Sequence, residues 1–443
     1  MYKMKKIYAI TVMLLLCLYG HTQDEVPTQE NLQARKAFAD MKFGIFLHWG
    51  IYSMFAQGEW YMHNANIDWR EYEKAASAFY PARFDAEAWV KAFKDAGARY
   101  ITFTTRHHDG FSMFHTEESD FNIVDATPYG RDVLKMLAEE CHKQDIMLNL
   151  YYSHLDWRRE DYPMGRTGRG THRDASKANW TTYYRFMNNQ LTELLTRYGK
   201  IGAIWFDGFW DHDQDSIPFD WQLEQQYQLI HKLQPACLVG NNHHVDVHPG
   251  EDIQIFERDV PGQNTAGYSG QAISRLPLET CQTMNGMWGY KITDQNYKST
   301  DELIRLLVRT SGKGANLLLN IGPQPNGELP ATALQRLKEM GAWLRDNGES
   351  IYGTTAGDIE EQPWGVTTRK NDTLYLHILH CNEKSLHLPL TCKVKSATLL
   401  HGRNVKFKQS KTGVTLLFDE QPTGVDYIVK LITEATKTKR QAQ

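Results

Sequence analysis

The sequence has 443 residues, of which 41% are apolar, and its formal net charge is −4. A chain of this length buries a large core and is too long for one ordinary domain. Its balanced charge excludes the basic surface that nucleic acids or anionic membranes would attract. Aromatic residues make up 12% of the chain, a proportion that suits stacking against sugar rings.

Residues 1–22 have the pattern of a secretory signal peptide. Lysines among the first residues are followed by an apolar segment at 7–18 and a cleavage site before Gln23. The apolar segment is too short to span a membrane as a helix. Cys17 could be the lipidated cysteine of a lipoprotein. The leucines before it, however, are not the small residues that normally precede such a cysteine. We expect export to the periplasm or secretion, without a membrane span.

Eight apolar segments of β type follow, with helical patterns between many of them. Their apolar residues occupy nearly consecutive positions, which is typical of parallel strands buried on both faces. The expected strands are 43–48, 100–105, 146–152, 203–207, 237–241, 253–257, 278–283 and 316–321. The expected helices are 85–96, 132–143, 176–198, 221–233, 300–310 and 332–347.

This alternation of strands and helices predicts a (β/α)8-like TIM barrel at 23–352. A doubly wound open sheet is the alternative, but no GxGxxG or GxxxxGK[ST] motif follows a strand, which argues against a nucleotide-binding version. Beyond residue 352, short alternating β segments are separated by turn residues. They predict a small C-terminal antiparallel β-sandwich at 353–435 and a frayed tail at 436–443.

The cysteines beyond the signal are too irregularly spaced for a disulfide framework or a zinc ribbon. Cys141, Cys237 and Cys281 lie in apolar patterns, where cysteine usually behaves as a small hydrophobe. Cys381 and Cys392 could still form a bridge within the C-terminal domain.

Polar and aromatic residues gather where the predicted strands end, and this end of a parallel barrel is its functional face. In Trp205-Phe206-Asp207-Gly208, an apolar strand ends in a carboxylate among aromatic rings. Carboxylates in such surroundings suit cleavage of a glycosidic bond, because its transition state is positively charged. Asp207 could also act only as a cap of the following turn.

Histidines follow several of the same strands, in particular His48, the pair His107-His108 and the pair His243-His244. Neutral histidines together with carboxylates can donate to and accept from sugar hydroxyls. A metal site is the alternative, but no HExxH or HxH motif is present, and adjacent histidines in one strand point to opposite faces. We expect neither a metal nor another cofactor.

Six motifs, in this order and at this spacing, make the sequence resemble the α-L-fucosidases of glycoside hydrolase family 29. They are FGIFLHWG at 43–50, GEWY at 58–61, TRHHDGF at 105–111, WFDG at 205–208, MWGY at 287–290 and NLLLNIGP at 316–323. The resemblance implies an exo-acting, retaining enzyme that removes terminal α-L-fucose through a covalent fucosyl-enzyme. Its substrate would be a fucosylated oligosaccharide or glycoconjugate.

The resemblance also assigns roles to residues of this chain. Asp207 matches the nucleophile, and Glu257 at the end of the sixth strand is the expected acid/base. Glu279 is the alternative acid/base, and it could instead be a buried structural carboxylate. The expected sugar-binding residues are His48, Glu59, Trp60, His107, His108, Tyr152, Trp205 and Trp288, the last near the C5 methyl group of fucose.

One departure from the family pattern follows the fifth strand. The family's arginine is not evident there, and Asn241-Asn242-His243-His244 occupies the region, so Asn242 or His243 would have to replace its contact. Two other functions stay open at this point. A metal-dependent hydrolase would use the histidine pairs, and a fucose-binding protein would lack catalysis.

Overall fold

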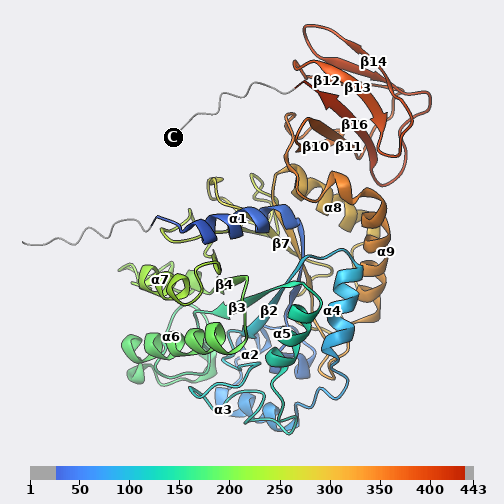
Figure 1. Ribbon diagram of the computed structural model, residues 1–443. Coiled ribbons are helices and arrows are strands. Elements are labelled where there is room, and N and C mark those ends of the chain that lie inside the picture. The colour runs from blue at the N-terminus through green and yellow to red at the C-terminus, as the bar shows by residue number, and fades with distance from the viewer. Residues whose placement is uncertain (1–25, 435–443) are drawn as a thin grey trace, which may run out of the picture.

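The computed structural model describes residues 26–434, which form a barrel and a smaller C-terminal β domain (Figure 1). The predicted signal peptide at 1–22 and the predicted tail at 436–443 lie outside the described residues. Within residues 26–434, no helix combines the length and the apolar character that crossing a bilayer requires.

Eight parallel strands form the barrel sheet in the order β5-β4-β3-β2-β1-β8-β7-β6. They are β1 (Phe43–Leu47), β2 (Tyr100–Arg106), β3 (Met147–Ser153), β4 (Ala203–Asp207), β5 (Leu238–Asn242), β6 (Gln254–Glu257), β7 (Leu278–Thr283) and β8 (Asn316–Ile321). The expected TIM barrel is confirmed, and the doubly wound alternative is wrong, because β1 pairs with β8 and brings the first strand beside the last.

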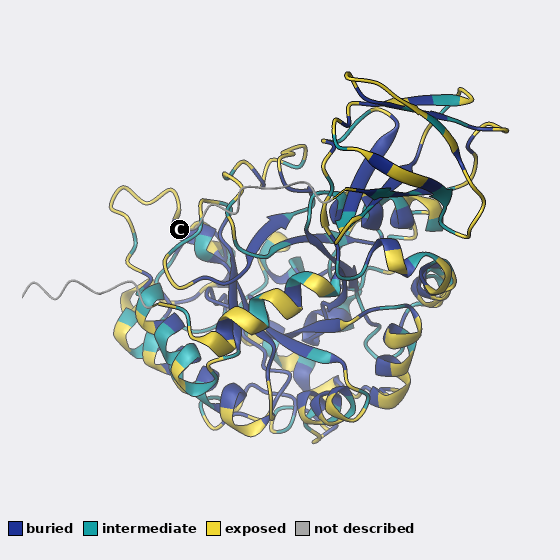
Figure 2. Cartoon of the chain, turned by 45° about the horizontal axis from the view of Figure 1, so that its top comes forward, coloured by how far each residue is buried: buried dark blue, intermediate teal, exposed yellow. Residues whose placement is uncertain are grey.

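The larger helices cover the outside of this sheet, with buried sides inward and exposed sides outward (Figure 2). They are α4 (Ala86–Asp95), α5 (Val133–Lys143), α6 (Trp180–Arg197), α7 (Leu223–Leu233), α8 (Thr300–Gly312) and α9 (Ala331–Asn347). Side chains of Asp85, Asp132, Asn179 and Ser299 accept hydrogen bonds from first-turn N–H groups and so fix where four of these helices begin.

Shorter helical pieces lie in the connections. They are α2 (Tyr61–Asn64), α3 (Trp69–Tyr72) and the 3-10 helices η1 (Ile51–Phe55), η2 (Glu73–Ala78), η3 (Arg169–Thr171), η4 (Ala175–Lys177), η5 (Phe209–His212) and η6 (Gly348–Ser350). The links 243–253 and 258–277, after β5 and β6, are loops. The helices expected from the sequence likewise include none in either link.

Helix α1 (Gln29–Met41), which the sequence patterns did not reveal, lies against the N-terminal ends of the strands. The side-chain amide of Asn316, the first residue of β8, donates to the carbonyl of Phe38 at 2.7 Å. The Phe38 ring is fully buried among the inward-facing residues Tyr100, Ala203 and Leu238. The opposite end of the barrel, where the strands finish, therefore remains available for a site.

A buried carboxylate joins β5 and β6, which share only an isolated bridge instead of a full ladder. Asp252 Oδ2 accepts from the backbone N–H of Val239 at 2.8 Å and lies 2.8 Å from His231 Nε2. Its Oδ1 accepts from Arg35 Nη2 at 2.6 Å and Asn31 Nδ2 at 3.0 Å. Asp252 is 0% exposed, so helices α1 and α7 are tied to this seam through one side chain.

The C-terminal domain contains two antiparallel sheets, ordered β13-β16-β11-β10-β9 and β12-β15-β14, which enclose a separate apolar core. Its strands are β9 (Thr355–Ala356), β10 (Gly365–Lys370), β11 (Thr373–Ile378), β12 (Ser385–Leu388), β13 (Val394–Leu399), β14 (Lys406–Gln409), β15 (Val414–Leu417) and β16 (Tyr427–Thr433). The domain lies against α8, where Arg309 and Glu361 form an ion pair at 2.6 Å. Cys381 and Cys392 are free thiols, so the suggested bridge is not formed.

Replacing Asp252 with alanine should destabilise the barrel. The substitution leaves the charge of Arg35 without its partner and removes a side-chain link across the β5–β6 seam. Breaking one side of a buried ion pair typically costs about 3–5 kcal/mol. Urea denaturation should show this loss as a lower midpoint.

Asp95→Ala is the matched control, because Asp95 pairs with Lys91 on the surface with both side chains more than half exposed. Exposed pairs contribute about 0–1 kcal/mol. Equal midpoints for the two variants would contradict the role given to Asp252.

Candidate active site

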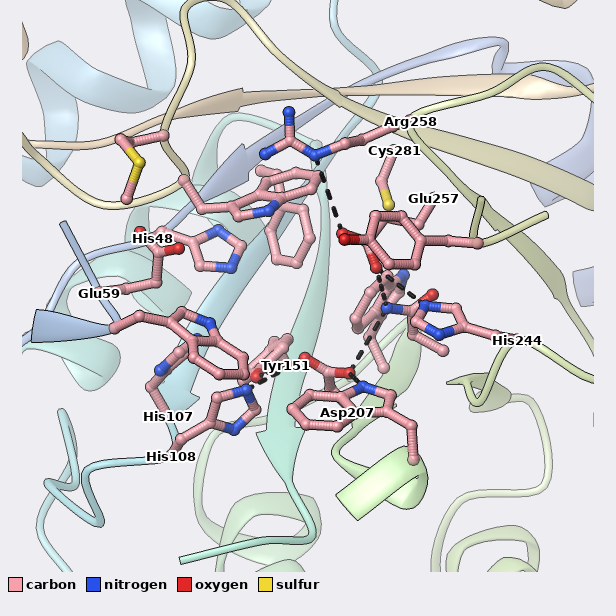
Figure 3. A pocket seen from close by; sticks show the side chains of 18 of the residues that line it. His48, Glu59, His107, His108, Tyr151, Asp207, His244, Glu257, Arg258 and Cys281 are labelled. Carbon is pink, nitrogen blue, oxygen red and sulfur yellow. Dashed lines mark hydrogen bonds and ion pairs between the residues drawn. The ribbon is translucent and has the colours of Figure 1, made fainter. Parts of the chain in front are cut away.

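A cavity of about 580 Å³ opens where the barrel strands end (Figure 3). Carboxylates, histidines and aromatic rings share its walls. The lining includes Phe46, His48, Glu59, Trp60, His107, His108, Tyr151, Trp205, Asp207, Trp210, Asn242, His244, Glu257, Arg258, Tyr268, Cys281 and Trp288. Of the residues that the sequence pointed to, Tyr152, His243 and Glu279 do not line the cavity.

The alternation of side chains along each strand decides which residues reach this cavity. In β4, Ala203 and Trp205 face the barrel interior, and Asp207 is the next residue on the same face. In β6, Ile255 faces the interior and Glu257 follows two residues later. The last inward position of a strand therefore lies at the open end, where a ligand can reach it.

Tyr152 was expected to bind sugar, and the structure contradicts this. It follows Tyr151 in β3 and faces the surrounding helices, where its hydroxyl donates to Gln190 Oε1 at 2.7 Å. Tyr151 occupies the position in the cavity, and its hydroxyl donates to Asp207 Oδ2 at 3.0 Å. The two-residue period of the strand was the signal that could have separated these neighbours.

Asp207 is held by several donors. Its Oδ1 accepts from the backbone N–H of Gly208 at 2.8 Å and from Trp210 Nε1 at 3.0 Å, while Tyr151 donates to Oδ2. The bond from Gly208 is of the kind that the capping interpretation expects, and the two side-chain donors go beyond it. Burial, with a further contribution from the charge of Glu257, raises the pKa of Asp207 to about 6 against the effect of these donors.

Asn242 lies between the two carboxylates of the cavity. Its Nδ2 donates to Glu257 Oε2 at 2.9 Å and lies 3.4 Å from Asp207 Oδ1. The separation of these two carboxylate oxygens therefore cannot exceed the sum of the two distances. Asn242 occupies the region where the family's arginine was not evident, and it makes a contact to both carboxylates.

Glu257 has a second partner in His244, whose Nε2 lies 2.9 Å from the same Oε2 (Figure 3). Burial acts to raise the pKa of Glu257, but the contacts of His244 and Asn242 and the charge of Arg258 outweigh it. The pKa of Glu257 is therefore lowered, whereas that of Asp207 is raised. The two carboxyl groups thus share one cavity and differ in proton affinity.

Glu279 lies below the cavity floor, inside the barrel. It is 0% exposed, and it accepts from the Tyr100 hydroxyl at 2.6 Å and from Trp205 Nε1 at 2.9 Å. Burial raises the pKa of Glu279 to about 7. Its contacts fix the ring of Trp205, which does line the cavity.

Three histidines of the cavity are buried and uncharged near neutral pH. Burial lowers the pKa of His48 to about 3 and holds those of His107 and His108 well below the usual value. His48 Nδ1 lies 2.7 Å from Asn320 Oδ1, and His108 Nδ1 lies 2.7 Å from Ser153 Oγ. These contacts orient the rings toward the cavity as neutral hydrogen-bonding groups.

The second histidine pair divides between two environments, although both residues lie beyond the end of β5, where strand alternation no longer applies. His244 reaches the cavity, while His243 turns away and lies 3.0 Å from Glu251 Oε1. His243 therefore does not contact the two carboxylates, and Asn242 does. Within residues 26–434, no three His, Cys, Asp or Glu side chains are arranged to hold a metal ion.

Aromatic rings form the remaining walls. Trp60 stacks on Trp210 with ring centroids 5.5 Å apart, and Trp288 lies 5.2 Å from the His48 ring. Arg258 covers the face of Trp288 at 5.1 Å. Glu59 Oε2 accepts from the backbone N–H of Gly289 at 2.7 Å, which fixes the segment next to Trp288.

Sequence reasoning missed several residues of the cavity, including Tyr151, Trp210, Arg258, Tyr268 and Cys281. Strand alternation could have identified Tyr151 and Cys281, since each lies on the inward face of its strand. Trp210 and Arg258 lie close in sequence to the assigned carboxylates. Tyr268 comes from the long loop after β6, and no sequence pattern pointed to it.

Known proteins with similar sequences and folds are α-L-fucosidases. The α-L-fucosidase family profile matches residues 14–349. The α-L-fucosidase of Dictyostelium discoideum is 28% identical over 460 residues, covering 93% of this chain and 95% of that protein. The structure of α-L-fucosidase isoenzyme 1 from Paenibacillus thiaminolyticus has a TM-score of 0.81 at 32% identity and covers 91% of this chain and 100% of the other.

A further structure has the same fold at lower identity. It is a family 29 α-L-fucosidase from Bacteroides thetaiotaomicron, described as a trapped covalent intermediate in complex with 2-fluoro-fucosyl fluoride, with a TM-score of 0.79 at 24% identity. It covers 93% of this chain and 100% of its own. The family profile spans most of the barrel and includes the strand ends that build the cavity. The chain therefore belongs to the α-L-fucosidases of glycoside hydrolase family 29.

Proposed function

We propose that this enzyme is exo-acting and retaining, and that it releases terminal α-L-fucose from glycans by double displacement. The contact of Asn242 with both Asp207 and Glu257 carries this proposal. The two distances, 3.4 and 2.9 Å, keep those oxygens closer than the roughly 6.5–9.5 Å typical of inverting enzymes. They are compatible with the roughly 5–5.5 Å of retaining enzymes.

Asp207 is the proposed nucleophile. Tyr151 and Trp210 fix its carboxylate so that one oxygen attacks the anomeric carbon and forms a fucosyl ester. The bond to the leaving-group oxygen breaks in the same step. The Bacteroides enzyme is described as a trapped covalent intermediate, which is the kind of species that this step would form.

Glu257 is the proposed acid/base. It protonates the departing oxygen in the first step and removes a proton from water in the second. Its contacts with His244 and Asn242 stabilise the ionised form, which suits the second step. In the first step the reactive enzyme carries its proton on Glu257 while Asp207 is ionised, so the two groups titrate as a coupled pair.

The neutral histidines are the proposed ligands of the fucose hydroxyls. Imidazole rings without charge can both donate and accept, as a hydroxyl does. His48, His107 and His108 line one side of the cavity, with Glu59 and Trp60 close by. Trp205 and Trp288 supply apolar surface for the ring and its methyl group. We also propose export directed by residues 1–22, which stays a prediction from the sequence.

Replacing Asp207 with glycine should abolish hydrolysis of 4-nitrophenyl α-L-fucoside while the fold is retained. Removal of a catalytic nucleophile typically lowers kcat by more than about a thousandfold. Azide should restore part of the turnover and give the β-fucosyl azide, because a small anion can occupy the space left by the carboxylate. Initial rates and circular dichroism check both expectations.

The same assay separates the two other functions. A fucose-binding protein without catalysis would give no turnover in the wild type. A metal-dependent hydrolase would contain stoichiometric metal and lose activity with a chelator, whereas we expect a chelator to have no effect. Near-normal turnover of the Asp207→Gly variant would remove Asp207 from the mechanism.

The pH profile of kcat/KM should show its alkaline limb near pH 6. The reactive enzyme holds one proton on the Asp207–Glu257 pair, and this last proton is lost near the pKa of Asp207, which burial raises to about 6. Tyr151→Phe removes a donor that stabilises the ionised carboxylate. The pKa of Asp207 should then rise further, and the alkaline limb should move upward by about one pH unit.

Tyr152→Phe is the matched control, since its hydroxyl contacts Gln190 and lies outside the cavity. This control should leave the alkaline limb in place. An unchanged limb in Tyr151→Phe, or an equal shift in both variants, would contradict the assignment of the limb to Asp207.

Glu257→Ala should cripple hydrolysis of natural fucosyl glycans, with a loss of about 10²–10⁴-fold typical of a missing general acid. Formation of the fucosyl-enzyme from 4-nitrophenyl fucoside or fucosyl fluoride should suffer much less, because good leaving groups need little protonation. Azide should rescue the second step with net retention of configuration.

Glu279→Gln should instead lower the melting temperature or weaken binding, since it disturbs the bonds to Tyr100 and Trp205. Both variants are measured with one good and one poor leaving group. If only Glu279→Gln shows the dependence on leaving group, the two glutamates exchange roles.

A further inference from the structure

One part of the cavity wall has no role in the reaction described above. The loop after β6 brings Tyr268 to the cavity, yet its side chain is 44% exposed. Most aromatic rings of the site are packed on several sides, whereas this ring presents apolar surface to solvent at the rim. A partly exposed aromatic ring in a carbohydrate-active cavity is a surface on which a second sugar ring can stack.

The loop holds Tyr268 in a defined place. Gly267 has a φ of 87°, a conformation that favours glycine, and it turns the chain just before the tyrosine. On the other side, the N–H of Ser269 donates to Asn264 Oδ1 at 2.9 Å. The Ser269 hydroxyl donates to the carbonyl of Glu257 at 3.1 Å. Tyr268 is therefore anchored to the strand end that carries the proposed acid/base.

Side-chain contacts give the position of Tyr268 relative to the reaction. Its ring lies 5.2 Å from the His244 ring, and His244 Nε2 lies 2.9 Å from Glu257 Oε2. A general acid must reach the oxygen of the bond that breaks, so the leaving group lies beside Glu257. Tyr268 contacts His244, which in turn contacts Glu257, so Tyr268 lies on the leaving-group side of the cavity, one side chain away from Glu257.

We propose that Tyr268 forms a binding subsite for the leaving-group sugar, an inference that rests on the proposed function. An uncharged pyranose would stack its C–H face on the tyrosine ring while its linking oxygen lies at Glu257. Two polar residues of the same cavity, Arg166 and Asp213, pair at 3.7 Å and compensate each other's charge. They suit contacts with neutral hydroxyl groups better than with an anionic sugar.

Binding to a protein that cannot turn over tests this subsite directly. Asp207→Gly is titrated by calorimetry with fucose and with a fucosyl disaccharide, chosen as the linkage that the wild type hydrolyses fastest. Adding Tyr268→Ala should weaken disaccharide binding roughly three- to tenfold, the loss expected for one aromatic contact, and leave fucose binding within about twofold. Tyr268→Trp should restore the disaccharide affinity.

Ile273→Ala is the control for effects on the loop itself. Ile273 lies in the same loop, is 53% exposed and is outside the cavity lining. This substitution should leave both affinities unchanged. In the enzyme with Asp207 intact, Tyr268→Ala should lower kcat/KM for the disaccharide more than for fucosyl fluoride, whose leaving group has no ring to stack.

The outcomes separate the subsite from the proposed function. Equal losses for fucose and disaccharide, or no loss for either, would overturn the subsite while fucose binding itself stands. If Asp207→Gly bound neither fucose nor the disaccharide, the proposed function would fall and the subsite with it.

Discussion

The alternation of side chains along parallel strands is the constraint on which this protein depends. Because all eight strands run in one direction, their last inward-facing residues meet at one end of the barrel. This brings Asp207, Asn242 and Glu257 together from three different strands. It also separates neighbours in sequence, so Tyr151 touches Asp207 while Tyr152 packs among the helices.

Placing two carboxylates in one largely buried cavity is unfavourable unless donors compensate it. Here the compensation is unequal. Asp207 keeps a raised pKa despite its donors, while His244 and Asn242 hold the pKa of Glu257 below its usual value. This order is the reverse of the protonation state of the first step, in which Asp207 is ionised and Glu257 carries the proton, so the reactive state is one of the two ways in which the coupled pair can hold a single proton. Asn242, in contact with both groups, ties their geometry together.

The side of the barrel around β5 and β6 differs from the rest. Loops replace helices after these two strands, and the buried Asp252 links strands that lack a full ladder. The same loops carry His244 and Tyr268, which extend the site beyond the two carboxylates. Loss of regular structure on this side thus coincides with the part of the cavity where we place the leaving group, and variable loops on a fixed barrel suit changes in specificity.

The sequence alone determined the barrel. Strands of a parallel sheet are buried on both faces, so each of the eight appears in the sequence as a nearly continuous apolar segment. It also pointed to Asp207, which ends such a segment, and the family resemblance pointed to Glu257 at the end of another. Tertiary structure decided the rest. Helix α1 has a weak pattern because it buries only Asn31 and Phe38, and Tyr268 reaches the site from a loop without periodicity. Whether Glu279 or Glu257 faces the cavity depended on the depth of each residue in the barrel, which appears only when the strands close around a common axis.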